Sequence, residues 1–76
     1  MNKEERKLLS RILEDLQGMN MGLEELKGDL ETKAQNVEEY FPGTCRAERL
    51  SLESEKLDEA FGNLDEAIRN IEEVLE

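Results

Sequence analysis

Hydrophobic residues recur at alternating intervals of three and four along nearly the whole chain, and this repeat is interrupted once. In the first half, one heptad position is filled by Leu9, Leu16, Leu23, Leu30 and Val37. The other is filled by Ile12, Met19, Leu26 and Tyr40. Only Lys33, beside Ala34, breaks the second row. A repeat sustained over more than four heptads predicts a long helix with a coiled-coil seam.

The interruption is the segment Phe41-Pro42-Gly43-Thr44. Pro42 disfavours the helical conformation for the residue before it, and Gly43 can adopt the left-handed conformation that ends helices. Thr44 can cap a second helix, with Ser51 as a competing cap. We therefore expect a single domain, residues 1–76, with helices over 3–40 and 45–75 and a tip at 41–44.

The second half repeats the pattern with a wider apolar stripe. Its two rows are Leu50, Leu57, Leu64 and Ile71, and Ala47, Ser54, Phe61, Ile68 and Leu75. Ala60, Ala67 and Val74 each precede a residue of the second row and widen the stripe on one flank. A wider stripe predicts contact with more than one neighbouring helix.

The fold class that follows is all-α, an antiparallel two-helix hairpin assembled into a homo-oligomeric, coiled-coil-like bundle. Two helices alone bury too little surface to be secure, which favours self-association. At 1.5 Å per residue, the second helix would end near the level of residue 11. Residues 1–13 would then form a basic, apolar end suited to an acidic flank of another copy. The expected interface consists of Leu8, Leu9, Ile12, Leu13, Ala60, Ala67 and Val74.

Composition argues against several classes of function. The 76 residues include 20 acidic and 10 basic side chains, one cysteine and no histidine, for a net charge of −10. Without histidine, Cys45 lacks its usual general base, so we expect no enzyme. The acidic pairs lack calcium-loop or Glu-x-x-His spacing, so we expect no metal and no cofactor.

The same charge and hydropathy limit the partners. A net acidic chain disfavours direct binding to nucleic acid, whose phosphates are held by lysine and arginine. No apolar run approaches the length of a membrane span, and the N-terminus lacks the apolar stretch of a signal peptide. We therefore expect no membrane contact and a cytoplasmic location in a bacterial host.

Two aromatic and two arginine side chains within ten residues make the tip the candidate ligand-binding site. Aromatic rings stack on bases, and guanidinium groups hold phosphate. The candidate residues are Tyr40, Phe41, Thr44, Arg46 and Arg49. In an oligomer, several tips or tip-to-shaft contacts would enclose a small anionic ligand.

A structural interpretation of the same residues stays open. In that interpretation the two aromatic rings close the core of the hairpin. The two arginines would then pair with Glu38, Glu39 or Glu53.

Three segments resemble small acidic helical-hairpin proteins of bacteriophages and prophages, and the likeness covers nearly the whole chain. They are Glu38-Glu39-Tyr40-Phe41-Pro42, Arg46-Ala47-Glu48-Arg49 and Leu64-Asp65-Glu66-Ala67-Ile68. Most such proteins have no assigned function. Some short phage helical hairpins act as sponges for cyclic nucleotide signals of bacterial immunity, and others are acidic inhibitors of nucleases.

Three hypotheses of function follow. The first, which the resemblance and the basic tip favour, is a non-enzymatic phage counter-defence protein that sequesters a small anionic, cyclic nucleotide. The second, which the net charge favours, is an acidic mimic of nucleic acid that inhibits a basic host defence protein. The third is a plain coiled-coil scaffold.

Overall fold

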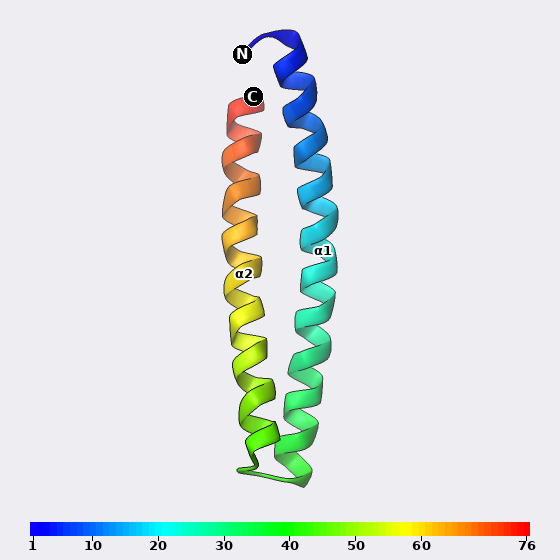
Figure 1. Ribbon diagram of the computed structural model, residues 1–76, viewed down its shortest axis with the longest axis vertical. Coiled ribbons are helices and arrows are strands. Elements are labelled where there is room, and N and C mark those ends of the chain that lie inside the picture. Colours follow the sequence, from blue (N-terminus) through cyan, green and yellow to red (C-terminus); the bar gives the residue numbers. More distant parts are fainter.

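The computed structural model describes all 76 residues as two long helices folded back on each other (Figure 1). Helix α1 spans Lys3–Tyr40 and helix α2 spans Cys45–Leu75. They form a rod of 57 × 15 × 14 Å, with both chain termini at one end and the turn at the other (Figure 1). The chain has no strand, and the helical hairpin expected from the sequence is confirmed.

Side chains at both helix starts satisfy backbone groups that a helix leaves unpaired. At α1, the Glu5 amide donates to Asn2 Oδ1 at 2.8 Å, and the Asn2 amide donates to Glu5 Oε1 at 3.0 Å, which is a capping box. At α2, the Ala47 amide donates to Thr44 Oγ1 at 3.2 Å. Gly43 has a φ of 74°, the left-handed conformation that the sequence predicted at the turn. Thr44 is therefore the cap of α2.

The seam between the helices is built from residues spaced alternately four and three apart. On α1 these are Leu9, Leu13, Leu16, Asn20, Leu23, Lys27, Leu30, Ala34 and Val37. On α2 they are Ala47, Leu50, Ser54, Leu57, Phe61, Leu64, Ile68, Ile71 and Leu75. Most are half-buried, and no large side chain is fully buried, because two helices cover only one side of each other.

One row of the α1 seam differs from the sequence prediction. The expected row of Ile12, Met19, Leu26 and Tyr40 lies outside the seam, with exposed fractions from 41% to 72%. The row containing Leu13 and Ala34 packs against α2 instead. This choice places Lys27 in the seam, where Asp58 and the Phe61 ring compensate its burial.

The N-terminal end also differs from the expectation. An Arg6 guanidinium nitrogen donates to the Leu75 carbonyl oxygen at 3.4 Å, so α2 reaches beyond the level of residue 11. Leu9 and Leu13 are half-buried in the seam and do not overhang it. The reason is the tight turn, which brings the start of α2 back alongside the last turn of α1 (Figure 1).

Candidate functional site

The aromatic residues of the tip do not close the hairpin core. Tyr40 is 72% exposed and Phe41 is 65% exposed. Arg46 and Arg49 are also exposed, and neither forms an ion pair with Glu38, Glu39 or any other residue. Thr44 is half-buried and its hydroxyl oxygen already accepts the capping hydrogen bond. Four of the five predicted tip residues thus have side chains free to meet a partner.

Two lysines outside the predicted tip, Lys33 and Lys56, lie on the same sides of their helices as the tip residues Tyr40 and Arg49. Lys56 lies one heptad after Arg49, and Lys33 lies one heptad before Tyr40, so helix geometry places each pair on a common face. Lys56 pairs with Glu59 at 3.5 Å, whereas Lys33 forms no ion pair. The heptad spacing of these residues is the signal that would have identified them.

Exposed apolar side chains gather on one face of the hairpin, here called the apolar face. It includes a groove of about 470 Å³ between the helices, lined by Leu26, Leu30, Leu52, Glu53, Lys56 and Leu57. Residues at heptad spacing from Leu26 and Glu53, or one turn away, extend this face along the rod. Beyond the groove, the apolar face consists of the exposed residues Leu8, Ile12, Met19, Leu26 and Val74 and the half-buried Ala60 and Ala67.

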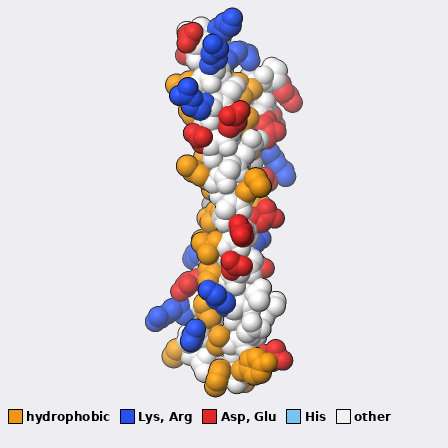
Figure 2. Space-filling view, turned by 90° about the vertical axis from the view of Figure 1, so that its right-hand side faces the viewer, with side chains coloured by type: hydrophobic (Ala, Val, Ile, Leu, Met, Phe, Trp, Pro, Cys, Tyr) orange, Lys and Arg blue, Asp and Glu red, His pale blue; other side chains and the backbone are white.

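Five of the seven predicted interface residues are therefore brought together on this face. The other two, Leu9 and Leu13, contribute to the seam. Figure 2 shows hydrophobic side chains in a column along one side of the lower half of the rod, with acidic side chains mainly on the other side.

The opposite side of the hairpin, here called the acidic face, carries a long series of carboxylates. Glu24, Asp65 and Glu72 line a cavity on this side. Residues seven positions from a lining residue, or one helical turn from it, lie on the same side of the helix and complete the acidic face. The acidic face consists of Glu14, Glu24, Glu31, Glu38, Glu55, Asp58, Asp65 and Glu72. Its basic residues are Lys3, Lys7 and Arg69, of which Arg69 pairs with Asp65 at 3.1 Å.

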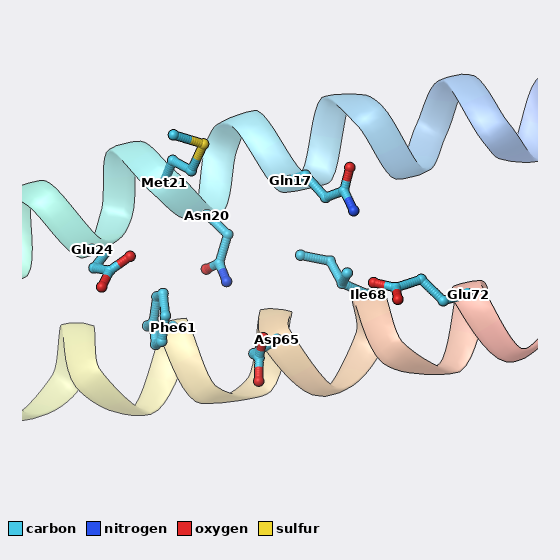
Figure 3. Close-up of a pocket in the computed structure, with 8 residues that line it drawn as sticks. All are labelled: Gln17, Asn20, Met21, Glu24, Phe61, Asp65, Ile68 and Glu72. Atoms are coloured by element: carbon cyan, nitrogen blue, oxygen red, sulfur yellow. The ribbon is translucent and has the colours of Figure 1, made fainter.

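The cavity on the acidic face has a volume of about 290 Å³ and lies near the middle of α1. It is lined by Gln17, Asn20, Met21, Glu24, Phe61, Asp65, Ile68 and Glu72. Figure 3 shows the Asn20 side chain projecting from α1 toward α2, between Phe61 and Ile68. Asn20 is only 5% exposed, and its Oδ1 atom has no hydrogen-bond donor within the chain.

Lys27 lies in the seam next to this cavity. Its Nζ donates to Asp58 Oδ1 at 3.0 Å and lies 5.1 Å from the centre of the Phe61 ring. The hydrogen bond to Asp58 raises the pKa of Lys27, and nearby carboxylate charges add to that effect while partial desolvation opposes it. The apolar pattern did not identify this cation, although Lys27 lies between Leu23 and Leu30 at the same spacing as Leu13 between Leu9 and Leu16.

Other candidate chemistry is sparse. Cys45 is exposed and unpaired at the start of α2. No group of three or more cysteine or acidic side chains is arranged to hold a metal ion. Neither helix contains a stretch both long enough and apolar enough to cross a membrane.

No family model, no curated protein and no solved structure matches this chain.

Proposed function

We propose that this protein is a non-enzymatic binding protein whose acidic face occupies a basic surface on another protein. The observation that carries the proposal is the separation of the acidic face from the apolar face on opposite sides of one rod. A basic surface that normally holds nucleic-acid phosphates is the chemistry that best complements such a row of carboxylates.

The charges on the acidic face are largely free to act on a partner. Of its carboxylates, only those of Asp58 and Asp65 form ion pairs within the chain. The remaining carboxylates, together with the net charge of −10, produce a negative field along the rod. Such a field speeds encounter with a basic partner and weakens as salt is added.

The apolar face supports a second part of the proposal, a homo-oligomeric bundle in which two copies pack through this face. The heptad positions of the apolar face contain a single charged residue, Asp15, over two stretches of the chain. These stretches run from Leu8 to Leu26 on α1 and from Ala60 to Val74 on α2. A second copy can therefore approach this face with little charge repulsion, whereas two acidic faces repel each other. The packing would supply the burial that the single hairpin lacks and would leave the acidic faces outward.

The test of the acidic face uses two triple variants with the same change in charge. One combines Glu24→Gln, Glu31→Gln and Glu38→Gln on the acidic face. The control combines Glu59→Gln, Glu66→Gln and Glu73→Gln, which lie on the side of α2 turned away from α1.

Bacterial proteins retained on immobilised duplex DNA are washed with each purified protein at micromolar concentration. The natural chain and the control are expected to displace the same discrete proteins, and the acidic-face variant to displace far less. No displacement by the natural chain would overturn the proposal. Equal displacement by both triple variants would show that net charge alone is responsible.

The tip supports a second candidate function, the sequestration of a small anionic nucleotide. The observation that favours it is the exposure of Tyr40 and Phe41 beside Arg46 and Arg49, none of them engaged within the hairpin. Exposed rings can stack on bases while unpaired guanidinium groups bind phosphate.

Calorimetry against cyclic dinucleotides, cyclic trinucleotides and cyclic ADP-ribose isomers tests this second function. Binding is expected to be lost in Arg46→Ala and Arg49→Ala, and to be kept in Arg69→Ala, whose arginine lies on the shaft. Absence of heat with every nucleotide would reject it.

A further inference from the structure

The cavity beside Asn20 contains a polar atom that no contact within the hairpin explains. Asn20 Oδ1 is buried and accepts no hydrogen bond, although a buried acceptor without a donor lowers the stability of a fold. Asn20 is one of the residues that line an open cavity of about 290 Å³, large enough to admit a ligand group, and a small shift of its side chain would bring the buried Oδ1 atom to the cavity wall. A hydrogen-bond donor from outside the hairpin would satisfy this atom.

The lining of the cavity indicates that this donor carries positive charge. Glu24, Asp65 and Glu72 contribute carboxylates, which only accept hydrogen bonds when ionised. Figure 3 places Glu24 and Glu72 toward opposite ends of the group, with Asn20 and Asp65 between them. These carboxylates are not clustered tightly enough to hold a metal ion. Acceptors spread in this way suit an organic cation with several N–H donors.

We propose that this cavity binds a guanidinium or ammonium group, with Asn20 Oδ1 and the Asp65 carboxylate as its central acceptors. The inference rests on the proposed function, because a basic partner bound to the acidic face would supply the cation as an arginine or lysine side chain. A free polyamine offers the same chemistry.

Two contacts within the chain illustrate the chemistry of this site. On the neighbouring turn, Lys27 is held by Asp58 and the Phe61 ring, which shows one cation already accommodated against this part of the seam. Arg69 pairs with Asp65, and its side chain is 74% exposed, so it can swing away when a ligand arrives. Arg69 is therefore a competitor whose removal should strengthen binding.

Nuclear magnetic resonance of the isotope-labelled chain provides the test. The probes are a glycine peptide with one central arginine, the same peptide with glutamine in its place, and spermidine. A cation probe is expected to shift the Asn20 side-chain amide signals with saturation, while the glutamine peptide leaves them unchanged. Asp65→Asn should weaken binding about fivefold or more, as expected for loss of a charged hydrogen-bond partner. Asn20→Leu, followed through the backbone amide signals of the cavity lining, should also weaken it, and Arg69→Gln should strengthen it.

A matched control and the choice of probes separate the outcomes. Glu73→Gln, which removes an exposed carboxylate outside both the acidic face and the cavity, should leave the affinity within about twofold, because an exposed distant charge contributes little. Tighter binding of the arginine peptide assigns the site to a protein partner, and tighter binding of spermidine assigns it to a free polyamine. No saturable shift with either cation, or equal weakening by Glu73→Gln and Asp65→Asn, overturns the proposal.

The DNA-displacement assay keeps this result distinct from the proposed function. If Asn20→Leu still displaces proteins from DNA and no cation binds the natural chain, the cavity is not a cation site, and the acidic face remains the proposed docking surface. Cation binding without displacement would retain the cavity and overturn the proposed function.

Discussion

Asn20 is a polar residue in the seam, where every other position on α1 except Lys27 is apolar. Its buried Oδ1 has no donor, and the adjoining cavity leaves room for a branched side chain. Asn20→Leu is therefore expected to raise the free energy of unfolding by about 1–3 kcal/mol, because it removes an unsatisfied buried polar group. Urea unfolding followed by circular dichroism measures this. A less stable variant would mean that Asn20 has a hydrogen-bond partner in solution.

Lys27 makes the stability of the hairpin depend on alkaline pH. Its pKa is raised above the ordinary value of 10.5 by the hydrogen bond to Asp58. A raised pKa in the folded state gives stabilisation that is complete below the unfolded pKa and is lost as pH rises through the folded pKa. The stability difference between the natural chain and Asp58→Asn should therefore be constant from neutral pH to about 9.5 and shrink above 10.5. Thermal unfolding across this range measures it, and a difference independent of pH would contradict the role of Lys27.

At the scale of the helices, the sequence predicted the elements but not which side of α1 packs on α2. The stripe of α2 has two apolar rows and a third row on one flank only, opposite a polar flank, so the orientation of α2 followed directly from the pattern. On α1, the row of Leu9 can be joined by the row of Ile12 or by the row of Leu13. The first is more apolar, but only the structure shows that Asp58 and Phe61 make room for Lys27 in the second.

The same difference explains how much of the candidate sites could be predicted. The tip residues are contiguous in sequence, so composition alone identified them. The cavity beside Asn20 depends on which residues of two distant segments face each other, and that follows from the packing of the helices. The packing choice also leaves the more apolar row exposed, which is the feature that indicates a second partner for α1.

The glycines of α1 weaken the helix without serving a contact in the hairpin. Apart from the adjacent residues and the helix's own backbone, no atom lies within 4 Å of a Cβ built at Gly18 or Gly28. Gly18→Ala and Gly28→Ala should each raise the free energy of unfolding by about 0.5–1 kcal/mol, the helix propensity that glycine lacks. Gly43→Ala is the opposite case, because its φ of 74° strains any side chain, and it should destabilise the turn. Chemical unfolding of the three variants checks this, and a destabilising Gly18→Ala would contradict an open helix surface there.

At the scale of the whole molecule, two methionines test which face meets a second copy. Met19 is 65% exposed on the apolar face, and Met21 is 71% exposed on the acidic side, two residues further along α1. Their substitution by glutamate makes the same chemical change on opposite sides of the rod. Packing through the apolar face would bury the Met19→Glu carboxylate without a partner, which costs several kcal/mol unless the group protonates. Met21→Glu would leave its carboxylate in water.

Sedimentation equilibrium at micromolar concentration distinguishes these cases. The natural chain and Met21→Glu are expected to self-associate alike, whereas Met19→Glu should weaken association by about tenfold or more, the equivalent of roughly 1.4 kcal/mol. Circular dichroism of each variant establishes that the helices persist. A natural chain that remains a monomer would remove the bundle from the proposal. If Met19→Glu and Met21→Glu weaken self-association equally, the added negative charge is the cause, and the apolar face has no special role in self-association.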